Sequence, residues 1–163
     1  VSGKLDATYG GPPDTVSVDR NGLVSVIPTA DGRWRRSIYL QYRRTEIPSM
    51  MDTFDYPEMG PNCLTRSTST VSPQSLMLLN DRHIKKLADA FAARIMNSQP
   101  SQPEQQIDLA YALALSRRPN ATERQLGIET LNALNAAWHE KPAAALESYC
   151  HTILNSAAFL YID

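Results

Sequence analysis

The amino-acid sequence predicts a mainly α-helical protein with a small β part, of the α+β class. We expect an antiparallel four-helix C-terminal bundle preceded by a β-hairpin and one further strand. In the first third of the chain apolar residues alternate with polar ones, whereas after Ser72 they recur every three or four residues between prolines. These two spacings are typical of strands and of amphipathic helices, respectively.

The stretch "VSVDRNGLVSV" predicts the hairpin. Val16 and Val18 precede an Asn21-Gly22 pair, and Val24 and Val26 follow it. Asn-Gly readily adopts the positive φ angles of a tight hairpin turn. The further strand is predicted in "RWRRSIYLQYRR", where Ile38, Leu40 and Tyr42 alternate with polar or amphipathic residues.

Prolines and capping residues predict where the helices begin. Ser72-Pro73 is a capping residue followed by a proline at the first helical position, and Pro103 and Pro142 follow polar connectors. Asn120, with Glu123 three positions later, resembles a capping box. "SMMDTF" is long enough for one helical turn, and the apolar tail "FLYID" is expected to fold back onto the body. The clearest helical face is formed by Ile84, Leu87, Ala88, Phe91, Ala92 and Ile95.

The length of 163 residues and the hydrophobic content of 42% predict one domain, 1–163. Within it we expect a β-rich segment at 1–47, an irregular connector at 48–72 and the helical bundle at 73–163. The chain opens at Val1 in a polar segment without an initiator Met. We therefore expect it to be the C-terminal portion of a larger multidomain protein.

Charge and motif content disfavour several classes of function. With 16 basic and 17 acidic residues the net charge is -1, so the sequence lacks the basic excess typical of nucleic-acid binding. No apolar run approaches the roughly 20 residues that cross a bilayer. The sequence contains no CxxC, CxxCH or HExxH motif, so we expect no metal and no cofactor in this segment.

The stretch "FDYPEMGPNCLTRSTSTVSPQSLMLLN" has two interpretations. As a connector, its Ser and Thr side chains would bond backbone groups and cap the next helix, and Asp55 would pair with an arginine to hold it in place. As a site, Arg36, Asp55 and Arg66 would bind an anionic, glycan-like ligand through bidentate hydrogen bonds. The residues alone favour the connector and identify no catalytic residue.

Two further groups of residues also leave alternatives open. Cys63 and Cys150 are either buried thiols or a disulfide that closes a long loop. Aromatic residues near the arginines either line the margin of the small sheet or form a sugar or peptide groove. These aromatic residues are Trp34, Tyr39, Tyr42 and Tyr56.

Four ordered blocks carry a resemblance to a known family. The blocks are "RRSIYLQYRR", "FDYPEMGPNCLTRSTSTVSPQSLMLLN", "LALSRRPNATERQ" and "CHTILNSAAFLYID". They cover nearly everything from Arg35 to Asp163, and the similarity is weak upstream of Arg33. The chain resembles the planctomycete surface domain family, a cytochrome-c-associated C-terminal domain of unknown function. Polar positions that match its blocks include Arg36, Asp55, Arg66, Gln74 and Asn80.

The resemblance implies a setting for the chain. It implies an exported, multidomain bacterial parent with cytochrome-c-like domains upstream, and an extracytoplasmic location in the periplasm or at the cell surface. We therefore expect a non-catalytic interaction or scaffolding module that packs against those upstream domains. The alternative is part of an enzyme or binding site that uses Arg36, Asp55 and Arg66.

Overall fold

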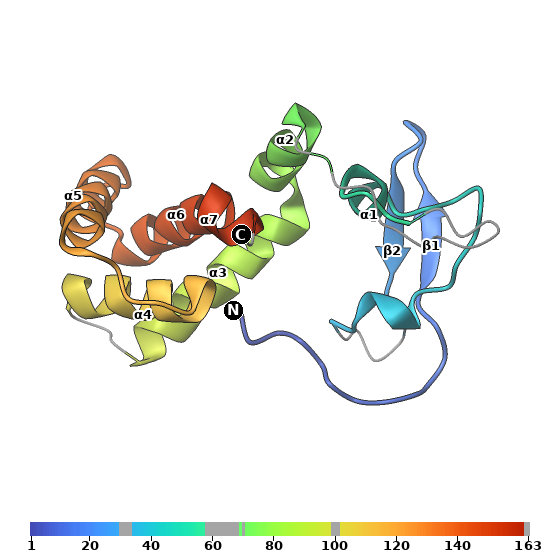
Figure 1. The fold of residues 1–163 in the computed structure, drawn as a ribbon, viewed down its shortest axis with the longest axis horizontal. Helices are drawn as coiled ribbons and strands as arrows, with labels where there is room; N and C mark the ends of the chain where they lie inside the picture. Colours follow the sequence, from blue (N-terminus) through green and yellow to red (C-terminus); the bar gives the residue numbers. More distant parts are fainter. Residues whose placement is uncertain (30–33, 58–68, 70, 99–101, 162–163) are drawn as a thin grey trace. The chain divides into compact units, whose positions relative to one another are not determined.

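The computed structural model describes residues 1–29, 34–57, 69, 71–98 and 102–161 (Figure 1). The chain divides into two compact units. The N-terminal unit is Lys4–Met77, and the helical unit is Leu78–Asp163 together with Val1–Gly3. Helices predominate over one small sheet, so the predicted α+β class is confirmed. The predicted single domain and its segment boundaries stay predictions.

The predicted hairpin is confirmed in the N-terminal unit. Strands β1 (Thr15–Val18) and β2 (Val24–Ile27) pair antiparallel, with Val16 opposite Val26. The loop between them is held by Asp19, whose carboxylate accepts the N–H groups of Asn21 and Leu23. Gly22 supplies the positive φ, at 81°. Because the N–H of Asp19 also donates to the carbonyl of Leu23, residues 20–22 form the loop proper, a common three-residue hairpin connection that ends in a left-handed glycine.

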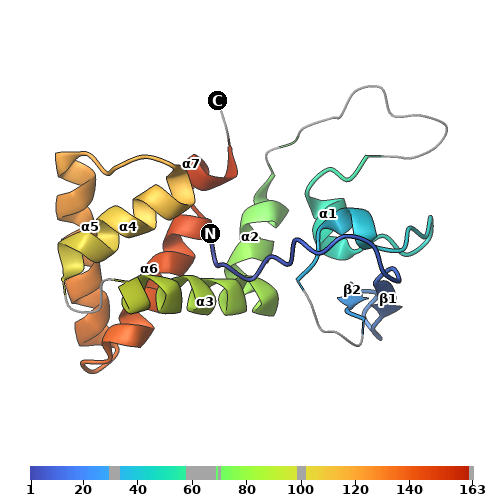
Figure 2. The ribbon, with the colours of Figure 1, turned by 90° about the horizontal axis from the view of Figure 1, so that it is seen from below.

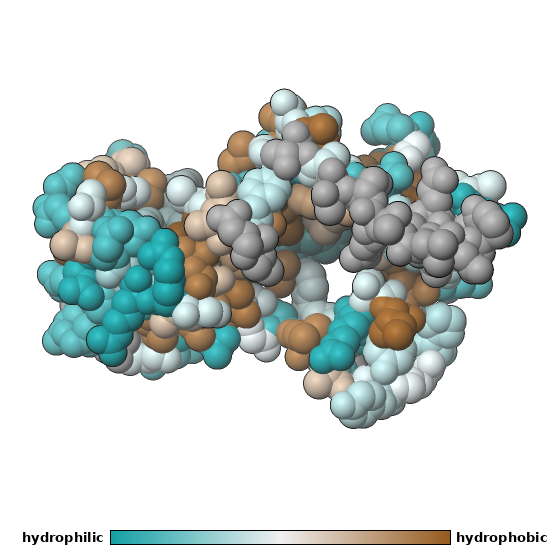
Figure 3. All heavy atoms as spheres, viewed as in Figure 1, coloured by the Kyte–Doolittle hydropathy of each residue, from teal (hydrophilic) through white to brown (hydrophobic). Residues whose placement is uncertain are grey.

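The predicted strand through Ile38, Leu40 and Tyr42 was wrong. Ser37–Tyr39 forms a short 3-10 helix, η1, and the sheet of the described residues has two strands. The N–H groups of Tyr39 and Leu40 bond locally, to the carbonyls of Arg36 and Ser37, which removes them from any ladder. Ile38 is 81% exposed, and Figure 3 shows hydrophobic surface in this region. Alternation of residue types therefore did not reflect alternation of burial here.

Two short helices lie on either side of residues 54–71 in the sequence. Helix α1 spans Ser49–Thr53, and α2 spans Ser72–Asn80, beginning at the predicted Ser-Pro pair. Helix α3 (Arg82–Ser98) follows after a break at Asp81. The carboxylate of Asp81 accepts the N–H groups of His83 and Ile84, which caps α3.

The helical unit also contains the four remaining helices. These are α4 (Pro103–Leu115), α5 (Ala121–Ala137), α6 (Pro142–Leu154) and α7 (Ala157–Leu160). Helices α4, α5 and α6 begin close to the predicted positions, whereas α7 was not predicted as a helix. Helix α6 packs against α3 and α5, and α4 packs against α5. Figure 2 shows these helices crossing one another. Pairwise packing is therefore established, whereas an antiparallel bundle stays a prediction.

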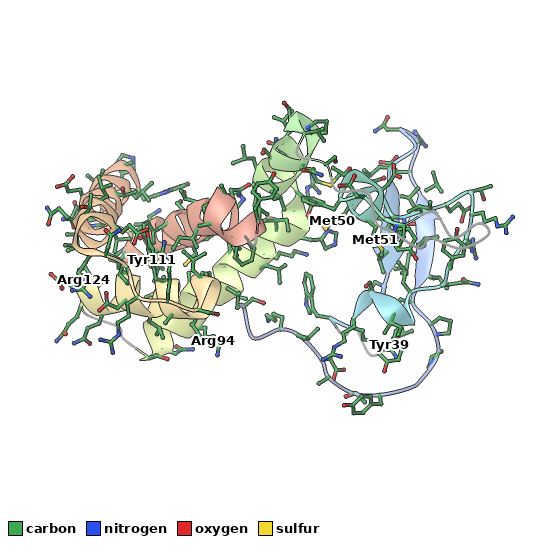
Figure 4. All side chains as sticks on the ribbon, viewed as in Figure 1. Tyr39, Met50, Met51, Arg94, Tyr111 and Arg124 are labelled. Carbon is green, nitrogen blue, oxygen red and sulfur yellow. The ribbon has the colours of Figure 1, made fainter. Side chains whose placement is uncertain are left out.

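The core of the helical unit lies where these helices meet. Gly127 of α5 allows close approach, because a Cβ there would lie 2.8 Å from Tyr149 Oη and 3.1 Å from two methyl carbons of Ile107. The N-terminal residues also belong to this unit, since Arg94 Nη1 donates to the carbonyl of Val1 at 2.7 Å (Figure 4). The largest fully buried side chains are Phe91, Ile95, Ile107, Leu146 and Cys150.

Candidate functional site

Asp55 is fastened to Ser69 within the N-terminal unit. Its carboxylate accepts the backbone N–H of Ser69 at 2.6 Å and the Ser69 hydroxyl at 2.8 Å. The φ of Asp55 is 56°, in the left-handed region that Asp and Asn enter more readily than most residues. The two bonds therefore hold Asp55 against a residue fourteen positions later.

Gln74 of α2 extends this contact into the interior. Its side chain is 3% exposed, and its Nε2 donates to the carbonyl of Thr53 at 3.1 Å and to Ser69 Oγ at 3.2 Å. Its Oε1 accepts the N–H of Val71 at 3.3 Å. A buried amide is tolerated when its hydrogen bonds are made, as they are here. We call Thr53, Asp55, Ser69, Val71 and Gln74 the polar knot.

The polar knot has limited capacity for chemistry. The Ser69 hydroxyl donates to Asp55 and accepts from Gln74, so both polar functions of a potential nucleophile are engaged internally. A serine nucleophile is usually activated by a base that is itself oriented by a third group. Here the Asp55 carboxylate accepts two hydrogen bonds from Ser69 and holds the two residues together, which is a structural role.

The three predicted ligand-binding residues are not brought together by the described parts of the chain. Arg36 lies just before η1 with an exposed side chain, for which the described residues provide no hydrogen-bond partner. Asp55 bonds Ser69 instead. Arg66 lies outside the described residues. The proposed anionic ligand site therefore stays a prediction.

Arg35, which precedes Arg36 in the sequence, bonds a distant part of the N-terminal unit. Its Nη1 donates to the carbonyl of Pro12 at 2.7 Å, and its Nη2 donates to the carbonyl of Gly10. The guanidinium carbon lies 4.1 Å from the centre of the Tyr39 ring, a cation–π contact. We call Arg35 and Tyr39 the Gly-Pro clamp, because Arg35 lies over the Tyr39 ring and bonds the carbonyls of Gly10 and Pro12. Tyr39 is labelled in Figure 4.

A small pocket lies nearby in the N-terminal unit. The rings of Tyr42 and Tyr56 are stacked, with centroids 6.2 Å apart and planes inclined by 26°. Arg43 Nη1 bonds Glu46 at 2.8 Å at the rim. We call this pocket the tyrosine cup; its lining residues are Leu40, Gln41, Tyr42, Arg43, Glu46, Ile47, Pro48, Met51 and Tyr56.

The block "LALSRRPNATERQ" forms the corner between α4 and α5. Both oxygens of Glu123 accept from Arg117 at 2.7 Å, and Glu123 also completes the capping box with Asn120. The Arg117 hydrogen bonds, followed by the Asn120 N–H, lower the pKa of Glu123 to about 2. The Arg117 guanidinium lies over Tyr111, 5.4 Å from the ring centre. Helix capping and the Arg117–Glu123 ion pair therefore explain the polar residues of this block structurally.

Cys150 of α6 is fully buried in the helical core. Burial raises the pKa of its thiol, so the reactive thiolate is disfavoured. Cys63 lies outside the described residues, so the disulfide between the two cysteines stays a prediction.

The side chains and helices of the described ranges bear on metal binding and on membrane insertion. No group of three or more His, Cys, Asp or Glu side chains there is arranged to hold a metal ion. None of the helices in those ranges combines the length and apolar character that spanning a membrane requires.

Comparison with known proteins identifies the family. A family profile described as PSD1, protein of unknown function (DUF1553), matches residues 1–131. The chain belongs to this family. The match includes the hairpin, which lies upstream of Arg33 where the resemblance of the sequence to the family is weak. It ends before the sequence block that begins at Cys150. No curated protein and no solved structure matches the chain.

Proposed function

We propose that this PSD1-family chain is a non-catalytic interaction module that packs against other domains of an exported, cytochrome-c-associated bacterial polypeptide. The observation that carries the proposal is an incompletely covered apolar face on the hairpin. We call Val16, Val18, Val24 and Val26 the valine face.

The strand register places the four valines on one side of the sheet. Val16 pairs with Val26 and Val18 pairs with Val24, and alternate residues of a strand share a face. Val16 is 7% exposed, whereas Val18 is 49% and Val26 is 40% exposed. Cover is therefore nearly complete at Val16, partial at Val24 and least at Val18 and Val26.

A two-stranded sheet of this size favours a partner. Isolated hairpins are marginally stable in water and gain stability when a hydrophobic face packs against another element. A domain of the same polypeptide can supply that surface without the full entropy cost of bringing two molecules together. The exported setting and the upstream cytochrome-c-like partner rest on the four sequence blocks that resemble the family.

The internal use of Asp55 also supports a non-catalytic role. Its carboxylate is the base on which the alternative, an enzyme or anionic-ligand site with Arg36 and Arg66, depends. Because Ser69 donates two hydrogen bonds to Asp55, that carboxylate already has a structural task.

The test compares Val18→Lys with Ser17→Lys, a matched change on the opposite face of β1. Both positions are exposed, so in the isolated chain each change should alter the free energy of unfolding by less than about 0.5 kcal/mol. In the polypeptide that the gene encodes, Val18→Lys alone should weaken domain packing by about 1–3 kcal/mol, because a buried valine is lost. Thermal unfolding of each variant, in the isolated chain and in the gene-encoded polypeptide, measures these changes in stability.

Two results would contradict the proposal. One is an equal effect of the two lysine substitutions in the gene-encoded polypeptide. The other is turnover of a polysaccharide, an ester or a redox dye by the isolated chain, because a module that only packs against its neighbours has no such activity.

A further inference from the structure

We propose that Asn21 is a site of spontaneous deamidation, at which the chain modifies its own backbone and thereby loosens the hairpin of β1 and β2. The reacting pair is Asn21-Gly22, in the loop that joins the two strands (Figure 1). This inference goes beyond the interaction-module proposal and does not depend on it.

The reaction consumes water and releases ammonia. The backbone nitrogen of Gly22 loses its proton to solvent and attacks Cγ of the Asn21 side chain. A carbon–nitrogen bond forms, the side-chain amide takes up a proton and leaves as ammonia, and a cyclic imide results. Water then opens the imide at either of its two carbonyls. One opening gives aspartate, and the other gives isoaspartate, in which the main chain runs through the former side-chain carbons.

The surroundings of Asn21 leave room for ring closure. Asn21 and Gly22 are both exposed. No atom of the described chain lies within 4 Å of the position that a Cβ on Gly22 would occupy, so the attacking nitrogen is not shielded. Within the described ranges, the Asn21 side-chain amide makes no hydrogen bond that would hold it away from this nitrogen. Glycine also has the backbone freedom that ring closure requires.

The hydrogen bonds of the loop control the rate. The N–H of Gly22 donates to the carbonyl of Asp19 at 3.1 Å, and this bond must open before the nitrogen can attack. The Asp19 carboxylate accepts the N–H groups of Asn21 and Leu23, each at 2.8 Å, and so restrains the same loop. Exposed loops open locally at a small free-energy cost. Deamidation should therefore follow local opening of this loop.

Isoaspartate fits this loop poorly. Residues 20–22 are closed by the hydrogen bond from the Asp19 N–H to the Leu23 carbonyl, at 3.0 Å. The rearranged residue adds a carbon to the main chain inside this closed loop. It also places a new carboxylate near that of Asp19, and like charges repel. Because each strand has only four residues, loss of the loop geometry should loosen the whole hairpin.

The experiment incubates the full chain at mildly alkaline pH and maps deamidation by mass spectrometry of its peptides. Asn155 is the internal reference, because it also precedes a small residue, Ser156. Its Nδ2 donates to the carbonyl of His151 at 2.9 Å, and the N–H of Ser156 donates to the carbonyl of Ile153 at 3.0 Å. Since both reacting groups are bonded there, Asn21 should convert about tenfold faster or more.

Asp19→Ala tests the control by the loop. This change removes the acceptor of two loop N–H groups, so conversion of Asn21 should accelerate several-fold. Asp52→Ala is the matched control, an exposed carboxylate outside the loop, and should leave the rate unchanged.

Amide hydrogen exchange tests the consequence for the hairpin. The fraction that contains isoaspartate, identified by enzymatic methylation, should exchange the amides of β1 and β2 faster than the unaltered chain. Freshly purified Asn21→Asp carries the added charge without the longer main chain, so its exchange should change less.

The inference is overturned if Asn21 converts no faster than Asn155, or if Asp19→Ala leaves the conversion rate of Asn21 unchanged. Equal exchange of the hairpin amides in the isoaspartate fraction and the unaltered chain would also overturn it. These measurements use the isolated chain, so they do not depend on the domain packing that Val18→Lys tests.

Discussion

Asp55 occupies a position that few residues can fill. Its left-handed φ of 56° suits Asp, Asn or Gly, and its carboxylate accepts two bonds from Ser69. We expect Asp55→Ala to lower the free energy of unfolding by about 2 kcal/mol, because the Ser69 donors lose their acceptor and the backbone is strained. Asp55→Asn should cost less, about 1 kcal/mol, because it keeps an acceptor and tolerates the backbone.

Denaturant unfolding of the two Asp55 variants measures this difference. Asp52→Ala is the control, because Asp52 is an exposed carboxylate on neighbouring α1. If both Asp55 variants unfolded like the unaltered chain, the polar knot would not be holding the segment.

Gly127 illustrates a packing requirement at a single residue. An alanine Cβ there would lie 2.8 Å from Tyr149 Oη and 3.1 Å from Ile107 methyl carbons. We expect Gly127→Ala to lower the free energy of unfolding by about 1–3 kcal/mol, because overpacking outweighs the better helix propensity of alanine. In the Gly127→Ala background, Tyr149→Phe should restore part of the loss by removing the nearest atom. Thermal denaturation that showed a gain for Gly127→Ala would contradict this packing.

At the scale of elements, the start of α5 should give a pH-dependent stability. Glu123 has its pKa lowered from 4.5 to about 2 in the folded chain, mainly by hydrogen bonds from Arg117. Its contribution is therefore present above about pH 4.5 and is lost as the pH falls toward 2. Glu123→Gln should be less stable than the unaltered chain at neutral pH, and the difference should disappear across this window.

Chemical denaturation at a series of pH values follows that difference. In an Arg117→Gln background the pH-dependent part of the difference should shrink, because the main cause of the lowered pKa is gone. A difference that stays constant from neutral pH to pH 2 would show that the α4–α5 corner does not stabilise the Glu123 carboxylate.

The helices could be predicted from sequence because their signals are local. Ser72-Pro73, Pro103 and Pro142 mark helix starts through the fixed φ of proline and its missing N–H. The Asn120 capping box likewise depends on residues three positions apart. A strand needs a partner elsewhere in the chain, which is why alternation around Ile38 predicted one where η1 forms.

At the scale of the whole molecule, the candidate site was less predictable than the fold. The sequence indicated that polar groups fasten the Phe54–Asn80 segment, and the structure shows Asp55 bonded to Ser69. It did not indicate that Gln74 would be buried between Thr53 and Ser69, because that depends on how distant segments meet. Tyr42 and Tyr56 were noted as candidates for a groove, but their stacking also depends on tertiary structure.

One sequence boundary between the two compact units falls within α2. Residues up to Met77 belong to the N-terminal unit, and residues from Leu78 belong to the helical unit. The hydrogen bonds of Gln74 hold α2 within the first unit, and His151 Nε2 lies 3.0 Å from the carbonyl of Leu78 within the second.

The interaction-module proposal is tested most directly by amide hydrogen exchange of β1 and β2. Exchange should be measured in the isolated chain and in the polypeptide that the gene encodes. Because a covering domain would suppress local opening of the hairpin, we expect slower exchange in the encoded polypeptide, with the amides of α5 as an internal reference. Equal exchange of the hairpin amides in the two forms would contradict the account.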